Sequence, residues 1–167
     1  MRIFLIGFMG SGKTTIGRKL SHRLGFTFID QDDLIEEMAV MTIPEIFSKE
    51  GEEGFRNREH QAIKELLTHN NVVVATGGGA PCFFNNMDLY NENGITIYLK
   101  MAPEILTSRL KYSATERPLI KNKTTDELLN FVETSLKKRE KFYQQATFVI
   151  EGIDLKVEDI LNVLGSK

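Results

Sequence analysis

Short apolar runs alternate with longer amphipathic stretches along this chain. Runs of branched and aromatic residues are typical of buried strands, which we expect at residues 2–6, 26–29, 72–75, 95–99 and 148–150. Stretches with apolar residues three and four positions apart are typical of amphipathic helices, which we expect at 13–24, 34–41, 46–67, 83–90, 103–110, 124–144 and 157–164. Residues 111–123 are polar and show no periodicity.

Strands that alternate with helices predict βαβ units and a parallel sheet with helices on both faces. A length of 167 residues suits one domain, residues 1–167, with one core. We therefore predict an α/β fold of three layers, α/β/α, around a five-stranded parallel sheet. Ligands bind such sheets at the carboxyl ends of the strands, which directs attention to residues 7–14, 30–33, 76–80 and 100–103.

The amino-acid composition limits the binding partners and the cellular compartment that we expect for this protein. The net charge is −2, from 21 basic and 23 acidic side chains, so we expect no nucleic-acid or membrane partner. The single cysteine, Cys82, cannot form an internal disulfide, and it is typical of a small buried apolar residue. The apolar run at 3–6 is too short for a signal peptide or a membrane span. We expect a cytoplasmic monomer that binds small molecules.

The segment from Gly7 to Thr14, with the sequence GFMGSGKT, fits the phosphate-binding pattern G-x-x-x-x-G-K-[ST] without deviation. It lies between a predicted strand and a predicted helix, where backbone N–H groups and a helix N-terminus can hold phosphate oxygens. The alternative is a flexible turn of glycine and serine. We predict a nucleoside triphosphate site, with Lys13 on the β- and γ-phosphates and Thr14 on Mg²⁺. The expected nucleotide-binding residues of the loop are Gly10, Ser11, Gly12, Lys13, Thr14 and Thr15.

Three carboxylates follow the second predicted strand, at Asp30, Asp32 and Asp33. Such a cluster repels itself unless a cation or a hydroxyl substrate lies among the side chains. We expect Asp30 to hold Mg²⁺ through water, and Asp32 to accept a hydrogen bond and a proton from a substrate hydroxyl. Asp32 or Asp33 could equally cap the helix expected at 34–41, and both interpretations can hold together.

The third predicted strand leads into three consecutive glycines, Gly77 to Gly79. Each glycine loses much chain entropy on folding, so a triplet is favoured where backbone must touch a ligand, with a loose loop as the alternative. Arginine is the bidentate partner of carboxylates and phosphates, although most surface arginines are only solvated. Arg117 stands out because it lies in the aperiodic segment 111–123, which we expect to act as a lid that excludes water.

Together these motifs resemble the shikimate kinases. The matching pieces, in family order, are GFMGSGKT at 7–14, FIDQD at 28–32, GE at 51–52, FRNRE at 55–59, TGGG at 76–79, RPL at 117–119, and Arg139 with Tyr143. The phosphate loop alone is shared by many families, whereas the combination is specific. The resemblance implies a P-loop fold of the nucleoside-monophosphate-kinase-like type. Within it, a substrate-binding subdomain is expected near 31–60 and a lid near 111–123.

The resemblance also implies an activity, the transfer of the γ-phosphoryl group of ATP to the 3-hydroxyl of shikimate on the way to chorismate and the aromatic amino acids. By position, Asp32 is similar to the family's base and Asp30 to its magnesium-side carboxylate. Arg117 is similar to the lid arginine on the phosphates, and Arg109 to the residue against adenine.

The remaining implied roles concern the acceptor. Arg56 and Arg139 are similar to the clamp on the substrate carboxylate, and Gly78 and Gly79 to backbone contacts with the substrate. Glu59 lies one helical turn beyond Arg56 and can orient its guanidinium.

The sequence departs from the family pattern at three places, one of which is Asp33, a third acid where the family varies, and three alternative functions stay open. Ala146 follows Tyr143 by three residues where the family usually has four, which leaves the register of the last strand open. No residue after Phe148 has a signature for adenine. The alternatives are a kinase of the same fold that acts on gluconate, one that acts on a nucleoside monophosphate, or a non-catalytic nucleotide-binding regulatory module.

Overall fold

Five parallel strands form one sheet in the order β2-β3-β1-β4-β5. The structure is a computed structural model that describes residues 1–113, 120 and 122–165. The strands are β1 (Arg2–Ile6), β2 (Thr27–Asp30), β3 (Val72–Ala75), β4 (Ile95–Lys100) and β5 (Phe148–Glu151). The predicted five-stranded parallel sheet is therefore confirmed. The register left open by Ala146 is also fixed, because Phe148 pairs with Ile97.

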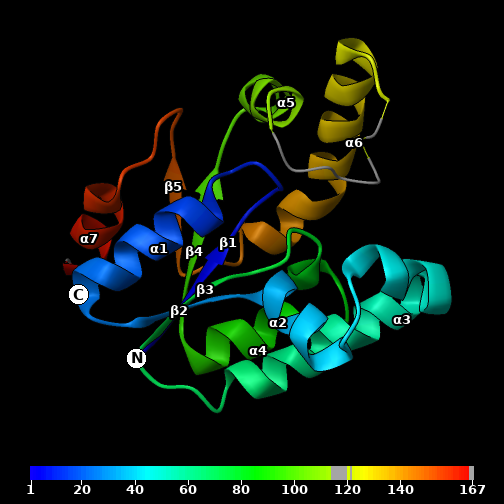
Figure 1. Cartoon of the computed structure of the whole chain (residues 1–167). Coiled ribbons are helices and arrows are strands. Elements are labelled where there is room, and N and C mark those ends of the chain that lie inside the picture. Colours follow the sequence, from blue (N-terminus) through cyan, green and yellow to red (C-terminus); the bar gives the residue numbers. More distant parts are fainter. Residues whose placement is uncertain (114–119, 121, 166–167) are drawn as a thin grey trace.

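Helices cover both faces of this sheet (Figure 1). They are α1 (Lys13–Leu24), α2 (Gln31–Ala39), α3 (Ile43–Leu66), α4 (Asn86–Asn93), α5 (Pro103–Lys111), α6 (Thr125–Tyr143) and α7 (Val157–Gly165), with a 3₁₀ turn, η1, at Ala80–Cys82. Side chains alternate across each strand, so Ile3 and Leu5 pack with α1 and α7, while Phe4 and Ile6 pack with the helices of the opposite face. The result is the three-layer α/β/α arrangement expected from the sequence.

A smaller apolar cluster joins α2 to α3, through Ile35, Ile46, Phe55 and Ala62. Helix α3 begins with a capping box, in which Thr42 and Glu45 bond each other's backbone N–H. It bends at Gly51, whose φ of 69° lies in the left-handed region that favours glycine. This separate cluster is consistent with the substrate-binding subdomain expected near 31–60, which stays a prediction.

Three predicted helices begin three residues away from the expected positions, among them α3, which begins at Ile43 where the pattern indicates 46. The helix expected at 34–41 begins at Gln31, because the carboxylate of Asp30 accepts a bond from the N–H of Asp32 and caps it. The capping role considered for Asp32 or Asp33 is therefore wrong. The helix expected at 83–90 is also wrong in its bounds. Phe84 has a φ of 50°, and the chain forms η1 before it and α4 after it.

Most of the lid segment expected at 111–123, including Arg117, lies outside the described residues. In the described part of the chain, no helix is both long and apolar enough to cross a membrane.

Candidate active site

The phosphate loop connects β1 to α1 and closes on itself through Lys13. The ammonium group of Lys13 donates to the carbonyls of Gly7 at 2.7 Å and Phe8 at 3.0 Å. Gly7, Gly10 and Gly12 have φ values of 148°, 83° and 90°, which other residues adopt only with strain. Such glycine conformations allow a loop to curl around a phosphate group next to a helix N-terminus, here that of α1.

Thr14, in the first turn of α1, and Asp30, the last residue of β2, lie side by side. The Thr14 hydroxyl donates to Asp30 Oδ2 at 2.8 Å, which brings together the two residues expected to hold Mg²⁺. Both supply oxygen atoms, the donors that Mg²⁺ prefers. Among the described residues, no group of three or more His, Cys, Asp and Glu side chains could hold a metal by itself. The pair therefore fits a magnesium ion that takes its other ligands from phosphates and water.

Asp32 and Glu59 meet at Gly77. A Cβ atom placed on Gly77 would lie 2.7 Å from Glu59 Oε1 and 3.2 Å from Asp32 Oδ1, so any other residue would displace one of these carboxylates. The first glycine of the triplet is therefore required by the close approach of two acids. Because Asp32 stands beside the triplet, a ligand on these glycines would be within reach of its carboxylate.

Glu59 is buried, and its environment changes its protonation. Burial raises the pKa of Glu59 from its ordinary value of 4.5 to about 7, although the neighbouring Arg56 guanidinium lowers it in part. Arg56 Nη1 donates to Glu59 Oε2 at 2.6 Å, which confirms that Glu59 orients this guanidinium. Arg56 also donates from Nη2 to Glu52 at 3.1 Å and lies over the Phe83 ring at 4.2 Å.

Arg56 faces Gly79 closely. A Cβ atom on Gly79 would lie 2.6 Å from Arg56 Nη1, so the absence of a side chain there makes room for the guanidinium. Arg56 Nε is buried, and no described residue accepts a hydrogen bond from it. A buried N–H without an acceptor is unusual in folded proteins, and it indicates that an anion can bind here.

Arg139 lies beside Gly78, the middle residue of the triplet. A Cβ atom on Gly78 would lie 3.7 Å from Arg139 Nη1, and that Nη1 likewise has no acceptor among the described residues. The same Cβ atom would lie 3.2 Å from the backbone N of Met9, in the phosphate loop. The Tyr143 hydroxyl donates to the carbonyl of Gly78 and fixes it. Gly78 is thus the point at which the phosphate loop and Arg139 meet.

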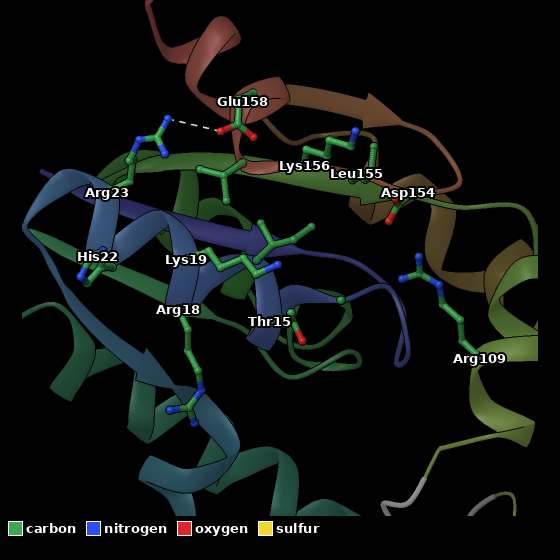
Figure 2. Close-up of a pocket in the computed structure, with 13 residues that line it drawn as sticks. Thr15, Arg18, Lys19, His22, Arg23, Arg109, Asp154, Leu155, Lys156 and Glu158 are labelled. Carbon is green, nitrogen blue, oxygen red and sulfur yellow. Dashed lines mark hydrogen bonds and ion pairs between the residues drawn. The ribbon is translucent and has the colours of Figure 1, made fainter.

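A pocket of about 800 Å³ opens on the other side of the phosphate loop (Figure 2). We call it the α1–α7 pocket; it is lined by Gly12, Thr15, Ile16, Arg18, Lys19, His22, Arg23, Arg109, Asp154, Leu155, Lys156, Val157 and Glu158. Figure 2 shows Arg109 and Asp154 facing each other at one end, and the ion pair of Arg23 with Glu158 at the other. Arg109 is held by a 2.7 Å bond from Nη2 to the carbonyl of Ile153.

The structure thus brings most of the predicted residues together in two groups. Gly10, Ser11, Gly12, Lys13, Thr14 and Thr15 lie on the loop and first turn of α1, with Asp30 beside Thr14 and Arg109 near Gly12. Asp32, Arg56 and Arg139 surround the glycine triplet. Arg117 lies outside the described residues.

Sequence reasoning missed three features of this region. Gln31 is completely buried between the two acids, Phe83 packs on Arg56, and residues 154–156 line the α1–α7 pocket. The position of Gln31 between two aspartates was a visible signal, whereas nothing in the local pattern indicated its burial. Phe83 lies in the segment 83–90, where the apolar pattern predicts a helix and gives no sign of a contact with Arg56.

Comparison with known proteins agrees with this geometry. The sequence profile of the family described as shikimate kinase matches residues 9–165. The chain belongs to the shikimate kinase family. It is 47% identical over 167 residues to the shikimate kinase of Azobacteroides pseudotrichonymphae, with 99% of this chain and 98% of that protein covered.

Solved structures of the family have the same fold. The crystal structure of shikimate kinase from Bacteroides thetaiotaomicron superposes with a TM-score of 0.93 at 40% identity, covering 99% of this chain and 97% of that one. Shikimate kinase from Acinetobacter baumannii, determined in complex with shikimate, superposes with a TM-score of 0.87 at 37% identity, covering 99% and 93% of the two chains. The resemblance drawn from the motifs is confirmed.

Proposed function

We propose that this chain transfers the γ-phosphoryl group of ATP to the 3-hydroxyl of shikimate, giving shikimate 3-phosphate and ADP for chorismate and aromatic amino-acid biosynthesis. One observation carries the proposal. Arg56, which is buried, and Arg139, which is partly buried, each have one buried N–H without an acceptor among the described residues. They flank a glycine triplet that touches the phosphate loop. A small carboxylate-bearing alcohol placed there would lie beside the phosphate donor.

On the donor side, the phosphates lie in the loop from Gly10 to Thr15. Lys13 exchanges its bonds with the loop carbonyls for bonds with the β- and γ-phosphates, and its positive charge offsets the charge that develops during transfer. Arg109 lies against the adenine in the α1–α7 pocket, whose other wall is the segment 154–156. Arg117, by its place in the sequence, covers the phosphates from the lid.

On the acceptor side, Arg56 and Arg139 hold the shikimate carboxylate, and the backbone of Gly78 and Gly79 contacts the ring. Asp32 accepts the hydrogen bond of the 3-hydroxyl. As the hydroxyl oxygen bonds to the γ-phosphorus, its proton moves to Asp32 and the bond from the γ-phosphorus to the β-phosphate oxygen breaks, leaving ADP.

Thr14 and Asp30 hold Mg²⁺ in this proposal, Thr14 directly and Asp30 through water. When bound, the ion neutralises charge on the β- and γ-phosphates. The active unit is a monomer in the cytoplasm, and it needs no nucleic-acid or membrane partner.

A coupled ADP-release assay over several acceptors tests the proposal. We expect ATP-dependent ADP release with shikimate, and release near the no-acceptor background with gluconate or nucleoside monophosphates. Activity with one of those acceptors and none with shikimate would favour another kinase of this fold. Nucleotide binding without turnover on any acceptor would favour a regulatory module.

A further inference from the structure

Gln31 is the first residue of α2 and lies completely buried between Asp30 and Asp32. Its side chain takes part in three hydrogen bonds with residues far apart in the sequence. Nε2 donates to the carbonyl of Glu59 at 3.2 Å, while Oε1 accepts from the N–H of Gly77 at 3.2 Å and from the Tyr90 hydroxyl at 2.8 Å. One amide therefore connects α2 to α3, to the glycine triplet and to α4.

The chemistry of these three partners suits a glutamine in particular. Two of the partners are donors and one is an acceptor, so the amide has one orientation in which every bond is satisfied. A leucine of similar size would leave the N–H of Gly77 and the hydroxyl of Tyr90 buried without partners. A glutamate would keep both acceptor bonds, lose the donor to Glu59, and add a negative charge beside Asp32 and Glu59.

The partners of Gln31 carry the groups of the acceptor site. A Cβ atom on Gly77 would touch both the Glu59 and Asp32 carboxylates. The position of the Gly77 peptide therefore determines how much space each carboxylate has. Glu59 in turn holds Arg56 at 2.6 Å. Asp32, the expected base, follows Gln31 directly in the chain, and Glu59, whose carbonyl the Gln31 amide bonds, holds the arginine of the expected carboxylate clamp.

We propose that Gln31 is a positioning residue for phosphoryl transfer. It fixes the spacing between the carboxylate of Asp32, the peptide of Gly77 and the Glu59–Arg56 pair, and so aligns the acceptor hydroxyl while the carboxylate is held. This proposal rests on the proposed function. Because a misplacement of about 1 Å at a reacting centre can lower a rate roughly 100-fold, loss of this amide should affect the acceptor more than ATP.

The test compares Gln31→Leu with wild type and with a matched control, Thr96→Val. Thr96 is also completely buried, and its hydroxyl bonds Asn91 and Thr147, but it lies at the amino-terminal end of β4, whereas the site lies at the carboxyl ends of the strands. Both variants replace a buried polar side chain by an apolar one and should lower the Tm. Steady-state kinetics below both Tm values then separate stability from positioning.

We expect Gln31→Leu to lower kcat/KM for shikimate by roughly 10- to 100-fold, because kcat falls and KM for shikimate rises. KM for ATP should stay within about twofold of wild type. Thr96→Val should keep wild-type constants. If Gln31→Leu does not fold, Gln31→Met decides, since it keeps the approximate length and volume of the side chain and adds no charge, but lacks the amide that makes the three hydrogen bonds. Unchanged shikimate constants in the folded Gln31 variant, or equal losses in Thr96→Val, would overturn the positioning role. Wild type without shikimate-dependent turnover would overturn the proposed function itself, and the positioning role with it.

Discussion

The carboxylate of Asp30 joins the phosphate loop to the acceptor acid. Its Oδ2 accepts a 2.8 Å hydrogen bond from the hydroxyl of Thr14, and its Oδ1 accepts a 3.1 Å bond from the backbone N–H of Asp32. The same side chain thus caps α2 and faces the residue expected to ligate Mg²⁺. The capping of α2 and the expected role toward Mg²⁺ can be separated by experiment.

Asp30→Asn should weaken the response to Mg²⁺ while it leaves the fold in place. Asparagine caps helices about as well as aspartate, so the Tm should change little. Loss of the charge should raise the Mg²⁺ concentration for half-maximal activity by roughly 10- to 100-fold, the usual effect of removing a residue that supports a metal. The measurement is a Mg²⁺ titration of turnover. Asp88→Asn in the first turn of α4 is the control, and an unchanged Mg²⁺ requirement in Asp30→Asn would contradict the role.

Asp32→Asn should lower kcat by about 100- to 10,000-fold, because the side chain can no longer accept a proton from the acceptor hydroxyl. ATP affinity, measured by calorimetry, should stay near wild type. The neighbouring Asp33→Asn makes the same change in charge on an exposed side chain and should keep most of the activity. Equal turnover in Asp32→Asn and wild type would rule out Asp32 as the base.

Gly79→Ala should weaken shikimate binding. The backbone of Gly79 has φ −91° and ψ −23°, which alanine adopts without strain, so an effect must come from the added methyl group. That methyl would lie 2.6 Å from Arg56 Nη1 and must displace the guanidinium. We expect KM for shikimate to rise about tenfold, which corresponds to about 1.4 kcal/mol, with KM for ATP unchanged.

The control is Gly165→Ala, since a Cβ atom on Gly165 meets nothing within 4 Å. If Gly79→Ala leaves KM for shikimate at the wild-type value, then Arg56 does not need its present position to bind the substrate.

Glu59 should make the protein less stable as the pH rises from about 4.5 to 7. In this range the buried side chain keeps a proton that the unfolded chain has released, because burial raises its pKa from 4.5 to about 7. The folded state binds more protons, so the free energy of unfolding falls with rising pH, by up to about 3 kcal/mol from this residue.

Urea unfolding of wild type and Glu59→Gln at pH 5 and pH 8 measures this contribution. The glutamine does not titrate and can still accept a bond from Arg56, so the variant should lack that part of the pH dependence. The same change in stability between the two pH values in both proteins would show that Glu59 is not protonated in this range.

The strands and the phosphate loop could be predicted from the sequence because their signals are local. The run at 3–6 is apolar throughout since both faces of β1 are covered, and the GFMGSGKT segment of 7–14 is defined by spacing alone. The order of the strands and the meeting of Gly78 with the phosphate loop depend on contacts between residues far apart in the sequence, such as Ile3 with Ile95 and Gly78 with Met9. A local pattern of apolar and polar residues does not predict such long-range contacts. The fold was implied instead by the combination of motifs that resembles the family.

The helices near the site begin at other residues than predicted because tertiary contacts there outweigh the local pattern. The acids at 30–33 are typical of a loop, yet Asp30 caps a helix that starts at once and takes Gln31 into the interior. The apolar spacing at 83–90 favours a helix, but Phe83 packs on Arg56 and Phe84 packs on His60, and the helix starts only after them. In both places the departure lies beside the candidate site.

The most direct test of the account is phosphorus NMR of the product made from ATP, Mg²⁺ and shikimate. We predict one new monophosphate ester whose phosphorus couples to the proton on carbon 3 of shikimate, formed in equal amount to ADP. ADP formed with inorganic phosphate alone, or a phosphate ester on another hydroxyl, would contradict the assignment of this chain as a shikimate kinase that acts on the 3-hydroxyl.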